Sequence, residues 1–83
     1  MTPLESNDFK HVIQNGAKYE GQYKFNKKNG NGSFYFPDGS VYHGQWLHDQ
    51  KHGLGTYIYQ NGDEFKGNWE KDLKHGQGTY TYR

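Results

Sequence analysis

The sequence of 83 residues contains no cysteine. This absence excludes disulfide bonds, thiolate metal sites and a cysteine nucleophile. Long hydrophobic runs are also missing, so the sequence predicts neither a transmembrane helix nor a signal peptide, and a cytoplasmic location is expected. Charge of one sign is not in excess, because the formal net charge is +1. Such a balance argues against a nucleic-acid binder, which neutralises many phosphates with Lys and Arg.

Aliphatic side chains are few, and aromatic ones take their place. The chain has eight Tyr, five Phe and two Trp, together with twelve Gly. Disordered chains are poor in aromatic residues, whereas each large ring can bury about 150–250 Å². A chain of this length is close to the lower limit for a free-standing core. The composition therefore predicts one small domain with an aromatic core.

A period of 23 residues runs through most of the chain. Four aromatic columns hold twelve of the fifteen aromatic residues: Tyr19/Tyr42/Phe65, Tyr23/Trp46/Trp69, Phe34/Tyr57/Tyr80 and Phe36/Tyr59/Tyr82. Four glycine columns hold all twelve glycines: Gly16/Gly39/Gly62, Gly21/Gly44/Gly67, Gly30/Gly53/Gly76 and Gly32/Gly55/Gly78. This periodicity predicts a repeat protein.

The repeats are predicted at residues 19–41, 42–64 and 65–83, the last one truncated after its second strand. Residues 9–18 are predicted to form a partial capping repeat, in which Val12-Ile13-Gln14-Asn15-Gly16 aligns with Ile58-Tyr59-Gln60-Asn61-Gly62. Residues 1–8 are expected to be a disordered N-terminal tail or a short helical turn.

Each repeat is expected to form two antiparallel strands, because its rings and glycines recur in steps of two. The turns are predicted at three dipeptides that accept positive φ: Asn29-Gly30, Asp38-Gly39 and Asn61-Gly62. Rings placed over bare glycines would set the register, with Phe34 opposite Gly21 in one neighbouring strand and opposite Gly44 in the other. The predicted fold is all-β, an elongated single-layer antiparallel meander of β-hairpins in which each repeat contacts only its neighbours. The residues predicted to hold it together are Tyr19, Gly21, Tyr23, Gly32, Phe34, Phe36, Tyr42, Gly44, Trp46, Gly55, Tyr57, Tyr59, Phe65, Gly67, Trp69, Gly78, Tyr80 and Tyr82.

The motif Tyr-x-Gly-x-Trp, followed by Gly-x-Gly-x-Tyr-x-Tyr and an Asn-Gly or Asp-Gly turn, resembles the MORN repeat. Its first half is found as Tyr19-Glu20-Gly21-Gln22-Tyr23, Tyr42-His43-Gly44-Gln45-Trp46 and Phe65-Lys66-Gly67-Asn68-Trp69. The resemblance covers residues 12–83 and implies the hairpin-repeat fold. Proteins with this repeat include cytoskeletal and ciliary components, junctional membrane proteins, and enzymes that carry the repeats beside a separate catalytic domain. The resemblance therefore implies a scaffold, a dimerisation element or a lipid-proximal module.

Catalytic, metal and phosphate sites are not supported by the residue pattern. His48, His52 and His75 do not converge as the four ligands of a zinc site would, and a structural turn role is favoured for their column. The stretch Gly30-x-Gly32 lacks the following helix and the lysine of a phosphate-binding loop. The acids near the turns, such as Asp38, Asp63 and Glu64, have no nucleophile or base beside them in the pattern. We expect a protein that is not an enzyme and that uses no metal or cofactor.

Three surfaces remain as candidates for binding. Lysines gather at one edge of the predicted sheet, at Lys27, Lys28, Lys51, Lys71 and Lys74, and are largely offset by Asp49, Glu70 and Asp72. The remainder of about two positive charges is weak for membrane attachment, so a solvated edge is favoured. The second surface is the face opposite the rings, which carries Tyr35, Leu47, Leu54 and Ile58, either as scattered hydrophobes or as a docking patch.

The third surface is the last strand, Gly78 to Tyr82, which has no predicted neighbour on one side and no charge before Arg83. Such an edge lacks the usual protection against pairing. Thr79, Tyr80, Thr81 and Tyr82 are therefore candidates for adding a strand from another protein or from a second copy; the alternative is a frayed end in water.

The sequence thus predicts a non-catalytic scaffold that mediates protein–protein interaction within a larger assembly, of the cytoskeleton or of a cilium or flagellum (axoneme). One alternative is a peripheral membrane or phosphoinositide-binding module, and another is an accessory subunit of an enzyme. A homodimer is a further alternative for the last strand.

Overall fold

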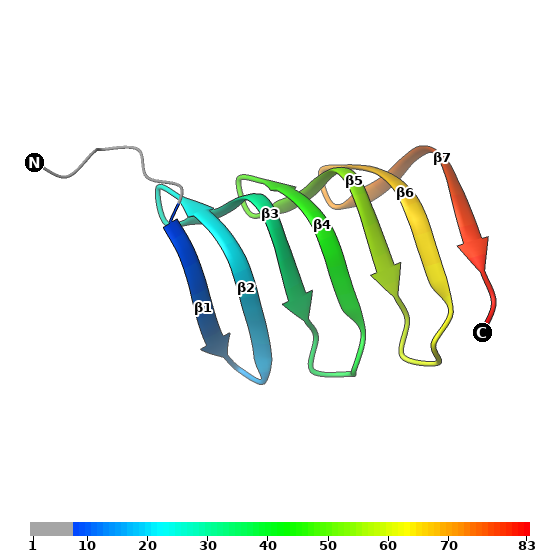
Figure 1. Cartoon of the computed structure of the whole chain (residues 1–83), viewed down its shortest axis with the longest axis horizontal. Helices are drawn as coiled ribbons and strands as arrows, with labels where there is room; N and C mark the ends of the chain where they lie inside the picture. The colour runs from blue at the N-terminus through cyan, green and yellow to red at the C-terminus, as the bar shows by residue number, and fades with distance from the viewer. Residues whose placement is uncertain (1–7) are drawn as a thin grey trace, which may run out of the picture.

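In the computed structural model, residues 8–83 form seven β-strands in one antiparallel sheet. The strands are β1 (Asp8–Gln14), β2 (Ala17–Lys24), β3 (Lys27–Tyr35), β4 (Val41–Leu47), β5 (Gln50–Ile58), β6 (Glu64–Glu70) and β7 (Leu73–Thr81). They lie side by side in chain order as a single layer (Figure 1). The all-β meander of hairpins is confirmed. The predicted tail, residues 1–8, lies outside the described residues except for Asp8, which begins β1.

The tight turns inside the repeats are not where the sequence predicted them. They consist of two residues that both have positive φ, at Phe25-Asn26, His48-Asp49 and Lys71-Asp72. Two-residue hairpin turns of this kind match the twist of the strands they join. Asn29-Gly30 lies inside β3, so the prediction of a turn there is wrong. Asp38-Gly39 and Asn61-Gly62 do lie in turns, which connect one repeat to the next.

Gly30, Gly53 and Gly76 lie in β-bulges and not in turns. In repeat 2, Gly44 pairs with Gly55 and Trp46 pairs with Lys51, so three residues of β5 lie opposite Gln45. The Gln45 Oε1 atom accepts a hydrogen bond of 2.8 Å from the Leu54 N–H and so replaces the lost ladder bond. Gln22 does the same in repeat 1, whereas repeat 3 has the shorter Asn68 at this position.

The bulge predicts different tolerance at two equivalent glycines. Gly53 and Gly76 have φ values of 70° and 71°, so alanine is strained at both. A Cβ at Gly53 would collide with the bonded Oε1 of Gln45, whereas a Cβ at Gly76 would meet nothing within 4 Å. We expect Gly53→Ala to lower the free energy of unfolding by about 1 kcal/mol more than Gly76→Ala. Urea denaturation measures both, and equal losses would show that the Gln45 bond does not brace the bulge.

The predicted register is wrong by two residues, although rings do cover glycines. Gly32 pairs with Gly21 and with Gly44, and Phe34 pairs with Tyr42, so rings stand opposite rings. The rings reach the glycines diagonally, because each leans along its own strand. A Cβ on Gly32 would collide with the ring of Tyr19, which covers that glycine from β2.

The partial repeat is also displaced by one residue from its predicted alignment. Val12 pairs with Tyr19 in the way that Tyr57 pairs with Phe65. Val12 is therefore equivalent to Tyr57 and not to Ile58. The displacement arises because the turn after β1 has only two residues, fewer than the turns between later repeats.

The core lies on one face of the sheet and is made of rings. Its buried members are Tyr19, Tyr42, Trp46 and Trp69, and Tyr23, Phe34, Phe36, Tyr57 and Phe65 pack against them. Several of the rings meet edge-on, as Tyr42 does with Trp46 at 5.0 Å between centroids, and others are tilted, as Tyr57 is against Trp69. Edge-to-face contacts of this kind add about 0.5–1.5 kcal/mol beyond the area they bury. The Tyr19 and Tyr42 hydroxyls donate hydrogen bonds to the Gln22 and Gln45 carbonyls, so burial leaves neither hydroxyl unbonded.

The buried tyrosines predict a loss of stability in alkali. Burial raises the pKa of Tyr42 from 10.0 to about 12, against the opposing effect of its backbone hydrogen bond. The folded protein therefore keeps a proton that the unfolded chain releases above pH 10, so this contribution is complete below pH 10 and is lost as the pH approaches 12. We expect urea midpoints to fall over this range and to fall less in Tyr42→Phe. Parallel curves for the two proteins would contradict the assignment.

Candidate interaction surfaces

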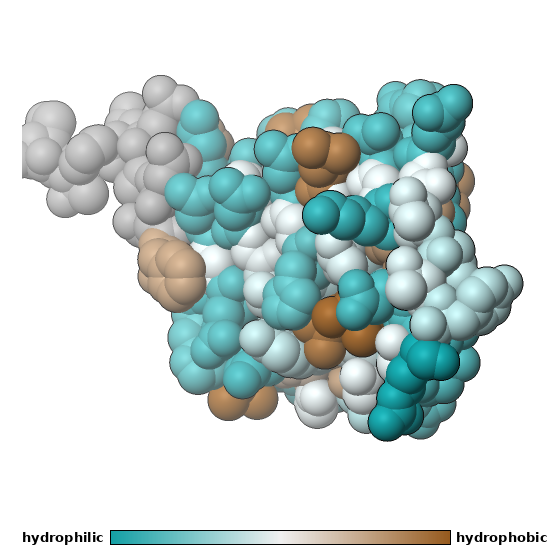
Figure 2. All heavy atoms as spheres, turned by 45° about the vertical axis from the view of Figure 1, so that its right-hand side comes forward, coloured by the Kyte–Doolittle hydropathy of each residue, from teal (hydrophilic) through white to brown (hydrophobic). Residues whose placement is uncertain are grey.

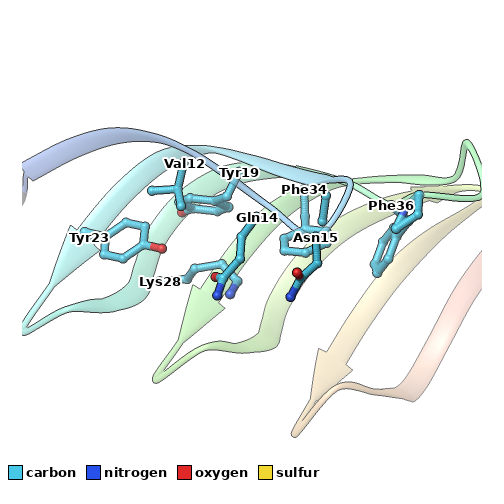
Figure 3. Close-up of a pocket in the computed structure, with 10 residues that line it drawn as sticks. Val12, Gln14, Asn15, Tyr19, Tyr23, Lys28, Phe34 and Phe36 are labelled. Atoms are coloured by element: carbon cyan, nitrogen blue, oxygen red, sulfur yellow. The ribbon is translucent and has the colours of Figure 1, made fainter.

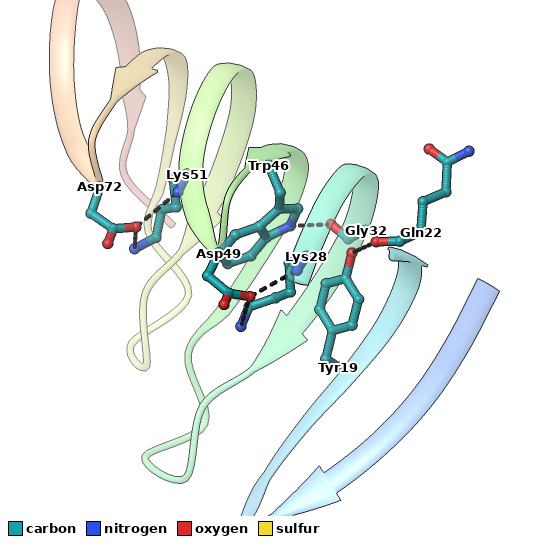
Figure 4. Close-up of polar contacts among 8 residues, drawn as sticks. All are labelled: Tyr19, Gln22, Lys28, Gly32, Trp46, Asp49, Lys51 and Asp72. Atoms are coloured by element: carbon teal, nitrogen blue, oxygen red, sulfur yellow. Dashed lines mark hydrogen bonds and ion pairs between the residues drawn. The ribbon is translucent and has the colours of Figure 1, made fainter. Parts of the chain in front are cut away.

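A seam of lysine and aspartate joins neighbouring hairpins. The Asp49 Oδ1 atom accepts a bond of 2.7 Å from the Lys28 N–H, and the Asp49 N–H donates to the Lys28 carbonyl at 3.0 Å. The Lys28 Nζ atom lies 3.4 Å from the same carboxylate oxygen (Figure 4). Asp72 brackets Lys51 in the same way one repeat later. The tips His48-Asp49 and Lys71-Asp72 are thus each attached to the strand of the hairpin before it.

The lysine–aspartate pairs of this seam differ from the pairs expected from the sequence. Asp49 was expected to offset Lys51 and Asp72 to offset Lys74, but each aspartate pairs with the lysine one repeat earlier. The lysine side chains are mostly buried and lie over rings; the Lys51 Nζ atom is 5.6 Å from the Trp69 centroid and 5.7 Å from that of Tyr42. Such cation–π contacts favour the folded position of the lysine. Two of the candidate lysines are therefore engaged inside the protein.

An open hollow of about 400 Å³ lies on the aromatic face at the β1 end of the sheet. Its walls are mainly apolar, as Figure 3 shows, and include Val12, Tyr19, Tyr23, Phe34, Phe36 and the side chain of Lys28. The sequence did not indicate this hollow, because it depends on Val12 facing the rings and the predicted alignment placed that residue on the other face. Its shape could accept an apolar side chain of a partner.

The residues predicted as a docking patch lie on the face opposite the rings, but they do not gather at one place. Tyr35 and Ile58 pair with the two sides of Val41, near one end of the strands. Leu54 is 64% exposed at mid-strand, and Leu47 is 38% exposed at the opposite end. On the side with β7 turned forward, hydrophobic atoms likewise form small separate groups (Figure 2). Scattered exposed hydrophobes are normal on a protein surface.

Strand β7 is the most open element of the described chain. Every residue from Leu73 to Thr81 is exposed, and β7 pairs only with β6. Tyr80 is 42% exposed and Tyr82, just beyond the strand, is 79% exposed. The end of β7 is nevertheless fixed, because the Tyr80 hydroxyl donates to Asp63 at 2.9 Å and the Arg83 N–H donates to the same carboxylate at 3.0 Å.

The direction of the backbone groups shows which of them face the open edge. In β3, the Lys28 N–H and the Gly32 carbonyl are both bonded toward the β4 side, to Asp49 and to the Trp46 indole. The groups of an antiparallel strand alternate in direction along the chain. The corresponding residues two repeats later, Lys74, Gly78 and Tyr80, therefore direct their backbone groups to the open edge. Thr79 and Thr81, also predicted as partner-binding, direct theirs to β6.

Residues 8–83 offer neither a side-chain cluster for a metal ion nor a membrane-spanning helix. No group of three or more His, Asp or Glu residues there has the arrangement of a metal site. No helix of that part of the chain could span a membrane.

A single sheet of repeated hairpins, with its rings packed on one face and its last strand paired on one side only, is the architecture of a repeat protein. The sequence pattern of the MORN repeat matches residues 19–41, 42–64 and 65–83. The chain therefore belongs to the MORN-repeat family. Repeats of this family generally take part in protein–protein or membrane and phospholipid interactions. No curated protein was found to match the chain.

Proposed function

We propose that this protein is a non-catalytic scaffold that joins a larger protein assembly through the open edge of β7. The observation that carries the proposal is the exposure of β7 along its whole length, with no charged residue from Gly76 to Tyr82. Edges of this kind accept extended segments, because the main chain supplies the hydrogen bonds and neighbouring side chains supply the selectivity. The fixed position of β7 against Asp63 keeps its edge extended for such a partner.

The polar groups of the repeats support a structural use. Asp49 and Asp72 bracket the backbone of the preceding hairpin. Asp38 accepts the Ser40 N–H in a turn, and the backbone N–H of Ser40 is the main reason that the pKa of Asp38 is lowered. These carboxylates are held by stabilising bonds and are not offered together to a substrate. A protein partner is also favoured over an anionic membrane, because Lys28 and Lys51 are paired within the sheet.

The proposed setting is the cytoskeleton or a ciliary axoneme. This part of the proposal is supported by the resemblance to cytoskeletal and ciliary proteins with the same repeat. Microscopy of the tagged protein against tubulin tests it, with colocalisation expected. A diffuse signal that detergent extracts completely would contradict this setting.

Edge docking is tested by a pair of variants at one position. Tyr80→Pro removes an N–H that faces the open edge, whereas Tyr80→Val removes the same ring and hydroxyl and keeps the N–H. Purification of each tagged protein from its own cells, followed by quantitative mass spectrometry, compares the partners recovered. We expect partners to be retained by the wild type and Tyr80→Val and lost by Tyr80→Pro. Equal recovery with the two variants would exclude the β7 edge as the binding surface.

A further inference from the structure

We propose that the open edge of β7 selects a strand with the pattern aromatic-x-Gly-x-Trp-x-x-Asp, supplied by a separate polypeptide. This inference rests on the proposed function, which does not specify the sequence of the added strand. It is carried by a comparison of β7 with β3 and β5, the equivalent strands of the two preceding repeats, whose outer edges are both occupied.

The edge of β3 is covered by β4 through two side-chain contacts. The Trp46 indole N–H donates to the Gly32 carbonyl at 3.1 Å. Asp49, three residues further along, brackets the N–H and carbonyl of Lys28. Next to the tryptophan along the same two strands, Gly44 pairs with Gly32. Neither residue has a side chain, so the two backbones meet directly on the face that the rings cover.

The edge of β5 is covered by β6 through the same contacts. The Trp69 indole N–H donates to the Gly55 carbonyl at 3.2 Å, and Asp72 brackets Lys51. Gly67 pairs with Gly55. A tryptophan, a glycine two residues before it and an aspartate three residues after it therefore form the occupant's side of this edge twice in one chain.

The outer edge of β7 has the same backbone groups as β3 and β5, but no strand of residues 8–83 pairs with that edge. Its Lys74 and Gly78 are equivalent to Lys28 and Gly32, and their backbone groups face outward. No carboxylate of residues 8–83 pairs with Lys74; its Nζ atom instead lies 2.6 Å from the Tyr59 hydroxyl and 4.6 Å from the Phe65 centroid. The Lys74 ammonium therefore lies over rings, as do the ammonium groups of Lys28 and Lys51, which are each paired with an aspartate.

At the β1 end of the sheet, both the glycine of the covered strand and the tryptophan and aspartate of the covering hairpin are replaced by other residues. Strand β1 has Lys10 opposite Gly21, where the later repeats have a glycine. The strand that covers it, β2, has Tyr23 in place of the tryptophan, and the turn after it has Asn26 in place of the aspartate. At these two positions of the repeat, tryptophan and aspartate thus occur only where the preceding strand offers glycine and lysine.

A second copy of the chain does not meet these requirements. The strands that carry the tryptophan and lead into the aspartate, β4 and β6, are paired on both sides, and the two edge strands, β1 and β7, contain no tryptophan. Pairing of β7 with its own copy would leave the Gly78 carbonyl without an indole and Lys74 without a carboxylate. The groups on this edge therefore fit a strand of a different chain with the repeat's first-strand pattern.

The test uses the whole protein and a labelled peptide with the sequence of residues 63–72, which has the full pattern. We expect saturable binding by fluorescence anisotropy and slower hydrogen exchange at the Gly78 and Tyr80 amides. The peptides Trp69→Phe and Asp72→Ala should each bind about tenfold more weakly, because each removes one buried or charge-assisted hydrogen bond. Lys66→Ala, altered on the opposite face, should bind like the parent peptide, and Tyr80→Pro in the protein should prevent binding that Tyr80→Val allows.

The outcomes separate the inference from the proposed function. If all four peptides bind equally, edge addition stands and the selection for this pattern is wrong. If no peptide binds and the protein instead forms a dimer that Tyr80→Pro dissociates, the occupant is a second copy and the inference is overturned. If no peptide binds to a monomeric protein, the inference is also overturned. The proposed function fails with it only if Tyr80→Pro and Tyr80→Val recover the same partners from cells.

Discussion

Replacing Gly55 by valine should lower the free energy of unfolding by about 3 kcal/mol, at the upper end of the usual cost of overpacking a core. Gly55 is buried, and a Cβ there would collide with the ring and hydroxyl of Tyr42. Tyr42 cannot move aside easily, because its side chain is fully buried and its hydroxyl donates to the Gln45 carbonyl at 3.0 Å. Urea denaturation of the purified variant measures the loss.

The matched control adds a valine where no ring lies over the strand. Thr79 is exposed in β7, so Thr79→Val should change the free energy of unfolding by no more than about 0.5 kcal/mol. If Gly55→Val and Thr79→Val melt at the same temperature, the packing of rings over glycines does not stabilise the sheet.

Truncating Trp46 should have a comparable or larger effect, about 4 kcal/mol for Trp46→Ala, as for other buried aromatic residues. This side chain lies between repeats 1 and 2, in ring contact with Tyr19, Phe34 and Tyr42. Its indole N–H also bonds the Gly32 carbonyl. The substitution therefore removes both packing and a hydrogen bond at one interface. Chemical denaturation followed by circular dichroism measures the loss.

A second substitution separates the two contributions. Trp46→Phe keeps a ring and removes the indole bond, so most of the loss should be recovered, with about 1 kcal/mol remaining for the hydrogen bond. Leu47→Ala, next in sequence and partly exposed on the other face, serves as the control and should have little effect. If Trp46→Phe is as unstable as Trp46→Ala, the carbonyl contact and not the buried ring dominates.

The repeat and the face that carries its rings were predictable, because both follow from residue spacing alone. Tyr42 and Trp46 recur 23 residues later as Phe65 and Trp69, and side chains in a strand alternate between faces. The register was not predictable in this way. A ring can cover a glycine directly across the strands or diagonally, and spacing does not distinguish these geometries. The choice is visible only in how the Tyr42 ring leans along β4.

The turns show a second limit of the sequence. Asn29-Gly30 has the composition of a turn, but positive φ at Gly30 is equally what a bulge needs. The real tips, Phe25-Asn26, His48-Asp49 and Lys71-Asp72, contain no glycine, and in the last two the aspartate bonds the neighbouring hairpin. A signal for this was present, since Lys28 and Lys51 recur at the same interval as Asp49 and Asp72. In the sequence these residues look like solvated charges, and only the three-dimensional arrangement shows them as pairs.

The two rims of the sheet differ in how much change in chain length they can tolerate. The tips at residues 25–26, 48–49 and 71–72 are all two residues long, and two of them bond the hairpin before. An inserted residue there would pull the aspartate away from its lysine. On the opposite rim, within residues 8–83, only Asp63 makes a comparable attachment, to Tyr80 and Arg83, and the turns already vary in length, being shorter after β1 than after β3 or β5. Insertions and deletions during the divergence of this chain should therefore accumulate on that rim and leave the lysine–aspartate rim constant in length.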